Sequence, residues 1–273
     1  MIEAFERVGR NTAAADGCRT WLLQQKRTRH WPSTKSTADA VHAVLLGGPT
    51  LLHDTALVRV ELGNRDVTPD PRAGPADPKS PPEPGTGFYR VRIPVADIGP
   101  ERSRVTVSKT DPGIAWGAVH WQYFEDLARV QPLAGTPLHV AKRLFVRNQT
   151  AQGPRLDPVQ GAVRVGDELV VRLELRVDRD LEFVHLKDLR GSGTEPVNVL
   201  SEYRFRDGLG YYESTRDTAS HFFIEYMPSG TYVFEYPLRV QHRGTFPVGV
   251  AEVQCMYAPE FNGHSESTDL TVR

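Results

Sequence analysis

Few residues of this chain have the types and the spacing that catalysis requires. Glu125 and Asp126 are neighbouring carboxylates, and two carboxylates held about 5 to 10 Å apart can hydrolyse a glycosidic bond. Neighbouring residues of a strand point to opposite faces of a sheet, so these two side chains do not converge, and we expect each to be solvated or bonded within a loop. Four histidines are widely spaced along the second half, and each is expected to be structural or to face solvent: His185, His221, His242 and His264.

Motifs of the common catalytic classes are absent from the sequence. There is no G-x-S-x-G, no H-E-x-x-H, and no Walker or dinucleotide-binding glycine loop. The only two cysteines, Cys18 and Cys255, lie far apart and form no C-x-x-C or metal-ligand spacing. We expect two free, buried thiols rather than a disulfide. The sequence therefore predicts a chain that is not an enzyme, with no catalytic residue, no cofactor and no metal site.

Composition excludes further classes of partner. The formal net charge is -1 over 273 residues, so no global electrostatic attraction to nucleic acid or to anionic lipid is expected. No apolar run approaches the roughly 20 residues that span a bilayer. The first residues carry charges where a secretory signal would have its apolar segment. The 23 glycines and 21 prolines favour a loop-rich β protein.

Residues 1–46 have the only convincing helical pattern. Asp16 can cap a first helix, and Ser33 or Thr34 can cap a second whose apolar residues recur at helical spacing. The glycines and proline at 47–49 then end the second helix. Such an αα-hairpin of fewer than fifty residues cannot bury its apolar stripes by itself. We therefore expect residues 1–48 to be poorly stable alone.

The middle of the chain predicts β structure interrupted by a proline-rich insertion. Alternation of apolar and charged residues indicates strands at 56–62, 88–95 and 103–108, and an aromatic strand at 114–124. Residues 69–87 hold most of the prolines of this region, and proline supports neither a ladder nor a helix. We interpret this stretch as an extended, solvated insertion without a specific partner. The alternative is a proline-rich ligand for a small recognition domain.

The second half predicts about seven short strands at the spacing of a β-sandwich. Strands are expected at 138–148, 163–168, 169–177, 181–189, 203–205 and 268–272, with a loop at 150–161. In the strand at 169–177 four alternate residues are expected to face the core: Val171, Leu173, Leu175 and Val177.

An aromatic stretch at 211–257 supplies the core of this predicted sandwich. Apolar runs at 221–226 and 231–240 flank Met227, Pro228, Ser229 and Gly230, which indicates a β-hairpin. A third run at 248–257 follows a turn-like segment. Together these runs predict a three-stranded meander.

Three stretches resemble the bacterial alpha-2-macroglobulin-like proteins. TWLLQQKRTRHWPSTKSTADAVHAVLLGG (20–48) resembles the end of their helical toroid, and GIAWGAVHWQYFEDLARV (113–130) resembles a strand near the end of their CUB-like domain. Residues 207–267 resemble their last macroglobulin-like sandwich, MG10. The resemblance implies a mainly β chain with an α-helical hairpin remnant of an α/α toroid at 1–48. It further implies a partial CUB-like β domain at 49–135, with the insertion 69–87, and an antiparallel MG10-like β-sandwich at 136–273.

The same resemblance implies a non-catalytic C-terminal module of an endopeptidase inhibitor that traps proteases. Its partners would be the remainder of the parent chain and, through the intact parent, proteases, in the periplasm or cell envelope. The chain would then be a truncated gene product or a fragment. Many family members carry a reactive thioester in a C-x-E-Q motif, but Cys18 is followed by Arg19 and Thr20, and Cys255 by Met256 and Tyr257. Neither the thioester nor a bait region can be carried over.

Aromatic residues of the helical and CUB-like regions are the expected interdomain contacts: Trp21, Trp31, Trp116, Trp121 and Tyr123. An alternative interpretation is an independent β-sandwich that binds a glycan or an extended peptide on an aromatic face or an open strand edge. Four aromatic residues motivate this alternative: Trp116, Trp121, Tyr211 and Tyr212. Since aromatic residues of strands more often pack in a core, the inhibitor module is the leading prediction.

Overall fold

The computed structural model describes residues 1–46, 58–69, 83, 87–110, 115, 117–133 and 136–273. Its contacts divide the chain into two units. Met1–Gln24 and Trp31–Val119 make up the first, and Gln25–His30 and His120–Arg273 the second. The predicted insertion at 69–87 lies largely outside the described residues.

Helices α1 (Ile2–Arg7), α2 (Thr12–Thr28) and α3 (Thr34–Leu45) form the start of the chain. The predicted cap of α3 is confirmed, because the Ser36 amide donates to Ser33 Oγ at 3.1 Å and the Ser33 amide donates to Ser36 Oγ at 3.0 Å. The predicted cap at Asp16 is wrong. Helix α2 begins at Thr12, and the Asp16 carboxylate lies inside the helix, 2.7 Å from an Arg19 nitrogen.

A small antiparallel sheet follows, in the order β2-β1-β3, from β1 (Arg59–Leu62), β2 (Arg65–Asp66) and β3 (Val105–Ser108). Two predicted strands are wrong. The segment 88–95 forms no strand and leads into the short 3₁₀ helices η1 (Val95–Asp97) and η2 (Pro100–Arg102). In the aromatic segment 114–124 the described residues, 115 and 117–124, also form no strand. Alternation of apolar and polar residues leads to a strand only where a neighbouring strand supplies backbone hydrogen bonds. In the described part of the chain, these two segments pair with no other strand.

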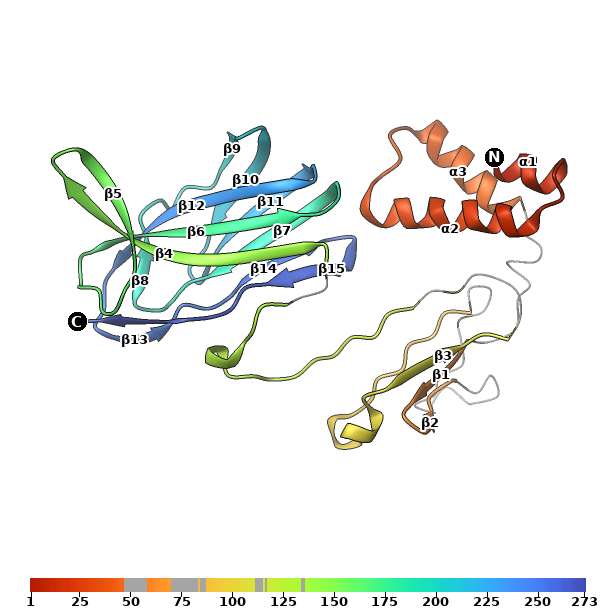
Figure 1. The fold of residues 1–273 in the computed structure, drawn as a ribbon, viewed down its shortest axis with the longest axis horizontal. Coiled ribbons are helices and arrows are strands. Elements are labelled where there is room, and N and C mark those ends of the chain that lie inside the picture. Colours follow the sequence, from red (N-terminus) through yellow and green to blue (C-terminus); the bar gives the residue numbers. More distant parts are fainter. Residues whose placement is uncertain (47–57, 70–82, 84–86, 111–114, 116, 134–135) are drawn as a thin grey trace. The chain divides into compact units, whose positions relative to one another are not determined.

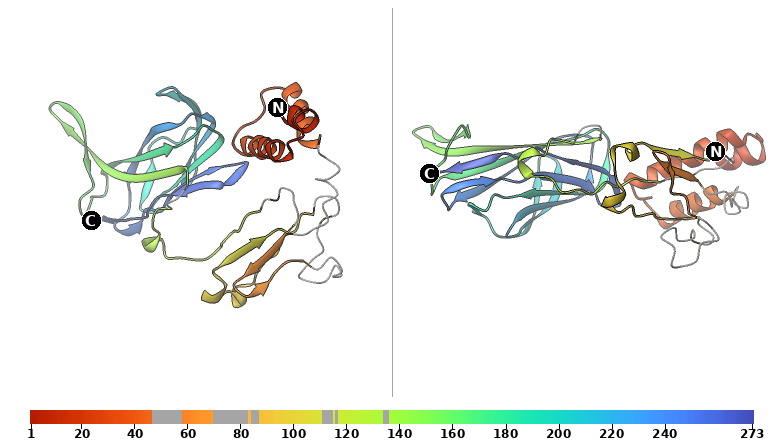
Figure 2. Two further views of the ribbon diagram at one scale, coloured as in Figure 1. Left: turned by 45° about the vertical axis from the view of Figure 1, so that its right-hand side comes forward. Right: turned by 90° about the horizontal axis from the view of Figure 1, so that it is seen from below.

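Residues 138–273 build an antiparallel β-sandwich (Figures 1 and 2), entered through the 3₁₀ helix η3 (Leu127–Arg129). One sheet has the order β15-β14-β7-β11-β10-β9 and the other β5-β4-β6-β12-β8, with a β13-β16 pair beside them. The strands are β4 (Leu138–Thr150), β5 (Gly153–Pro158), β6 (Glu168–Val177), β7 (Leu181–Leu189), β8 (Thr194–Pro196), β9 (Glu202–Arg206), β10 (Leu209–Thr215), β11 (Ala219–Met227), β12 (Gly230–Val240), β13 (Gly244–Pro247), β14 (Ala251–Cys255), β15 (Ala258–His264) and β16 (Asp269–Val272). The predicted mainly β fold with an antiparallel sandwich is confirmed.

The core lies between the two sheets. Four residues of β6 predicted to face inward are all buried, which confirms the alternation: Val171, Leu173, Leu175 and Val177. The predicted loop at 150–161 is wrong, since residues 153–158 form β5 and pair with residues 145–150 of β4. Pro154 and Pro158 are compatible with this strand because β5 is the edge of its sheet, where one side of the strand has no partner among the described strands. Figure 1 shows β5 extending beyond the body of the sandwich.

The predicted meander is also wrong, although its strands exist. β11 and β12 belong to different sheets, and β14 pairs with β7 and β15 rather than with β12. Phe222 of β11 and Phe234 of β12 are both buried, with ring centroids 5.0 Å apart across the core. The connection through Pro228 therefore crosses the sandwich. Burial of an aromatic face on each strand outweighs the local preference for a hairpin, because core burial is the larger free energy.

Candidate contact surfaces

The predicted contact residues are distributed over the two units of the chain. Trp21 and Trp31 belong to the first unit, whereas Trp121 and Tyr123 belong to the second, and Trp116 lies outside the described residues. Trp21, Trp121 and Tyr123 are exposed, and Trp31 is half-buried. Their role in interdomain contact stays a prediction.

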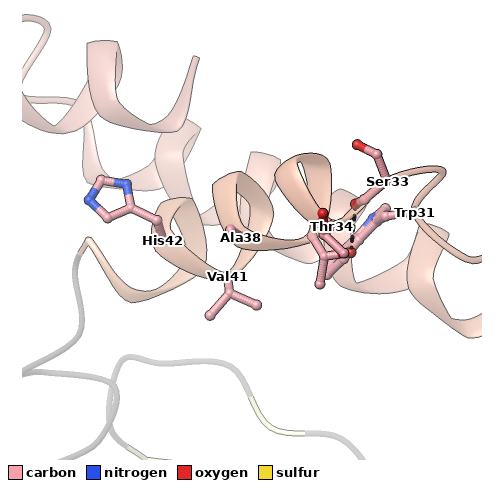
Figure 3. Close-up of a pocket in the computed structure, with 7 residues that line it drawn as sticks. Trp31, Ser33, Thr34, Ala38, Val41 and His42 are labelled. Carbon is pink, nitrogen blue, oxygen red and sulfur yellow. Dashed lines mark hydrogen bonds between the residues drawn. The ribbon is translucent and has the colours of Figure 1, made fainter.

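Trp31 lines a shallow groove beside α3 (Figure 3). The other lining residues come from the start of the helix and its exposed face: Ser33, Thr34, Thr37, Ala38, Val41 and His42. Val41, which belongs to the predicted apolar stripe, is exposed. The groove has apolar walls and no carboxylate among its lining residues, so it suits an apolar side chain better than a charged ligand.

One end of the sandwich exposes a compact apolar cluster, the sandwich tip, formed by Phe183, Met256 and Tyr257. Met256 and Tyr257 form the turn between β14 and β15 and are 53% and 75% exposed. The ring of Phe183 packs edge-on against Tyr257 at 5.0 Å, and the Met256 amide donates to the Phe183 carbonyl at 2.9 Å. Phe183 has φ +54, a conformation rare for a bulky residue, and such strain concentrates at functional sites.

Cys255 anchors this turn from beneath. Its thiol is buried and donates to the Glu182 carbonyl at 3.2 Å, next to a register shift between Gln254 and Cys255. Burial raises the pKa of the Cys255 thiol, which lowers the thiolate population that a nucleophile needs. Both cysteines are free, as predicted, although Cys18 is only half-buried.

Acidic residues close to the tip bind a basic segment that sequence reasoning missed. Residues 25–30 belong to the sandwich unit. Arg27 Nε donates to Glu260 at 2.6 Å, His30 Nδ1 lies 2.6 Å from a Glu182 oxygen, and Arg29 pairs with Asp180. The run KRTRH at 26–30 was the available signal, but nothing local identifies its acidic partners.

A second missed group lies inside the sandwich. Lys142 of β4 and Asp188 of β7 form an ion pair between the two sheets, with 2.7 Å between Nζ and Oδ1, and Tyr236 of β12 donates to Asp188 Oδ2 at 2.5 Å. Burial lowers the pKa of Lys142 and raises those of Asp188 and Tyr236. The side chain of Asp188 is 0% exposed and that of Lys142 5%, so no substrate reaches them.

The remaining sequence candidates do not assemble a reactive site. Glu125 and Asp126 are both exposed and lie just before η3. His185 and His221 come together on neighbouring strands, with 2.9 Å between Nε2 and Nδ1. Within the described residues, no three His, Cys, Asp or Glu side chains are grouped so that they could hold a metal ion.

A model of a known protein family matches most of the sandwich. Residues 138–260 match the model of the bacterial alpha-2-macroglobulin MG10 domain. The sandwich is similar to an MG10 domain. The match runs from β4 into β15 and includes the tip.

Solved structures of bacterial alpha-2-macroglobulin are similar to the chain at low identity. Escherichia coli alpha-2-macroglobulin activated by porcine elastase is 15% identical, with a TM-score of 0.49, over 100% of this chain and 23% of that one. The trypsin-activated protein of Escherichia coli is 14% identical, with a TM-score of 0.47, over 100% and 18%. Salmonella alpha-2-macroglobulin reacted with methylamine is 18% identical, with a TM-score of 0.42, over 52% and 10%.

Among curated proteins, circularly permutated Ras protein 2 of Dictyostelium discoideum is 27% identical over 149 residues, 54% of this chain and 4% of its own length. The chain thus spans less than a quarter of the length of each of these relatives. In the described part of the chain, no helix combines the length and the apolar character needed to cross a membrane.

Proposed function

We propose that this chain is a non-catalytic C-terminal module of a bacterial alpha-2-macroglobulin-like endopeptidase inhibitor. In this role the MG10-like domain contacts and supports the remainder of the inhibitor. Residues 1–46 would be the end of a helical toroid, and the small sheet at 59–108 would be part of a CUB-like domain. The observation that carries the proposal is the exposed tip on a domain of macroglobulin type.

The tip has the composition of a contact surface. Met256 is flexible and polarisable, which suits adaptable contacts, and Tyr257 combines a large apolar ring with a polar hydroxyl. Aromatic residues and methionine are enriched in interfaces between proteins. Both side chains project from a turn whose flanking residues, Cys255 and Ala258, are buried. Because these neighbours fix the turn, its backbone should lose little conformational entropy on binding.

A supporting role agrees with the chemistry of the two thiols. Neither cysteine lies in a C-x-E-Q sequence, and the Cys255 thiol is buried with a raised pKa. An acyl group on Cys255 would have to be placed inside the sandwich. The trap would then obtain its reactive chemistry from other parts of the inhibitor, with location in the periplasm or cell envelope as the corresponding expectation.

The alternative of an independent glycan- or peptide-binding module receives less support. Tyr211, one of the aromatic residues that motivate it, is buried, and its ring packs against Phe222 and Phe234. Tyr212 is half-buried. The ring of Tyr212 lies 4.9 Å from that of Tyr203, between centroids.

Protease trapping in cells that express the chain tests the proposal. Antibodies against residues 138–273 should detect, in the periplasmic fraction, a polypeptide that retains added trypsin while the trypsin still cleaves small substrates. The variant M256S/Y257S should retain less trypsin at unchanged protein level, whereas V165S, at an exposed turn of the same domain, should behave as the wild type. A detected polypeptide that retains no trypsin would contradict the proposal.

A further inference from the structure

Strand β9 is an edge of the six-stranded sheet. Among the described strands it pairs only with β10, and Figure 1 shows it at the border of the sandwich. All five of its residues are exposed, with Tyr203 at 84% and Phe205 at 80%. Its pairing with β10 is continuous, without a bulge, and the strand contains no proline. Natural sheets protect such edges with bulges, proline, charged side chains or short strands, because open backbone groups and apolar side chains invite another strand. Of these devices, β9 has its short length and three charged residues, Glu202, Arg204 and Arg206.

The two faces of β9 differ in chemistry. Tyr203 lies opposite Tyr212, with ring centroids 4.9 Å apart, and Arg204 lies opposite the buried Tyr211. Opposite residues of an antiparallel pair share a face. Tyr203 and Phe205 therefore lie on the outer face of the sheet. The charged residues Glu202, Arg204 and Arg206 share the face of Tyr211.

The order of these residues makes the strand complementary to itself. In an antiparallel pair of two β9 strands centred on Arg204, residue 202 lies opposite residue 206, and residue 203 opposite residue 205. The outer face then gains two Tyr203–Phe205 pairs. The other face gains two Glu202–Arg206 pairs of opposite charge. Aromatic and opposite-charge pairs are the cross-strand contacts that stabilise antiparallel sheets.

At the centre of this pair, Arg204 of one copy lies opposite Arg204 of the other. The two like charges are tolerated because each Arg204 already has acidic partners. Its side chain lies 2.5 Å from a Glu213 oxygen and 2.8 Å from a Glu202 oxygen. Glu213 is buried, so its carboxylate is held beside Arg204 by the fold. Two Arg204 side chains at a twofold axis would thus each carry a counter-charge from their own domain.

We infer that β9 is a docking edge for a second copy of this chain. Two MG10-like domains join there about a twofold axis and form one continuous sheet, as in other symmetric dimers with a self-complementary interface. A five-residue edge is small compared with the roughly 1,600 Å² of a standard interface. The dimer is therefore weak and depends on protein concentration. This inference is independent of the inhibitor assignment and would hold for the isolated chain.

Charge reversal tests both the surface and its register. In sedimentation velocity over a concentration series, the wild-type chain should form dimers. E202R places arginines opposite Arg206, and R206E places glutamates opposite Glu202, so each variant should weaken dimerisation by about a hundredfold or more. A mixture of E202R and R206E restores opposite charges at both positions and should form heterodimers. The double variant E202R/R206E should dimerise again.

The matched control is E174R, a charge reversal at an exposed residue of β6 in the other sheet, which should dimerise as the wild type does. Far-UV circular dichroism and the melting temperature confirm that each variant is folded. A wild-type chain that stays monomeric throughout the series overturns the inference, as does a dimer that neither reversal weakens. If both single variants lose the dimer but their mixture does not restore it, the register centred on Arg204 is wrong and the inference fails.

Discussion

Lys142 provides the sharpest test of what stabilises the MG10-like sandwich. Its ammonium donates to three carbonyls, those of Leu189 at 2.6 Å, Val248 at 2.9 Å and Gly249 at 3.4 Å, and it pairs with Asp188 at 2.7 Å. These groups lie where β7 ends and where the chain enters β14. Replacing Lys142 by methionine keeps much of the apolar stem and removes the charge. The Asp188 carboxylate then remains buried without a counter-ion.

The expected loss of folding stability in K142M is large. Removing one partner of a buried ion pair costs about 3 to 5 kcal/mol, because the other charge stays in a medium that solvates it poorly. The unfolding entropy is about 2.1 cal/mol/K per residue, so for roughly 140 residues a loss of about 4 kcal/mol lowers the melting temperature by roughly 14 °C. The variant K142M/D188N should recover part of this loss, because no buried charge remains.

Calorimetry and urea unfolding followed by far-UV circular dichroism measure the effect, since all four tryptophans precede the sandwich and do not report on it. The control R143M changes the neighbouring, exposed residue of β4 and should stay within about 0.5 kcal/mol of the wild type.

Lowering the pH should restore part of the stability that K142M loses. Burial already raises the pKa of Asp188, and Lys142 opposes that shift, so removing Lys142 raises the pKa further. The folded state then binds a proton that the unfolded state releases, and stability rises as the pH falls. A free energy of unfolding of K142M that lies within about 1 kcal/mol of the wild-type value would refute the reasoning. An acid-induced loss of stability as large in K142M as in the wild type would refute it too.

Two further predictions concern the same domain. Burial, as the largest cause, lowers the pKa of both His185 and His221, so the folded state binds fewer protons than the unfolded one. Stability should fall as the pH drops through about 6.5, and H185Q/H221Q should show a shallower fall in urea titrations at several pH values. Gly249 has φ +71, and an added Cβ would lie 2.5 Å from Leu189 Cβ. G249A should therefore cost about 2 kcal/mol or more, whereas G153A, with φ +110 but open space around it, should lower the melting temperature less.

Local patterns determined where most strands of the sandwich lie and which face of β6 is buried, although they missed β5. The alternation in β6 correctly predicts the burial of four alternate residues: Val171, Leu173, Leu175 and Val177. This prediction holds because side-chain direction along a strand depends only on the residue's own position. Helix capping at Ser33 was equally local. The family resemblance of residues 207–267 rested on the same linear information and agrees with the match over 138–260.

Tertiary structure decided which strands pair and which charges meet. The sequence of residues 221–240 predicts a hairpin, yet β11 and β12 lie in opposite sheets. Phe222 and Phe234 face each other across the core, which lowers the free energy more than hairpin pairing would. Lys142 meets Asp188 only through the packing of β4 over β7. The alternation of apolar and polar residues determines which face of a strand is buried, but not which strand it pairs with. Partners far apart in the sequence are determined by burial in the assembled core.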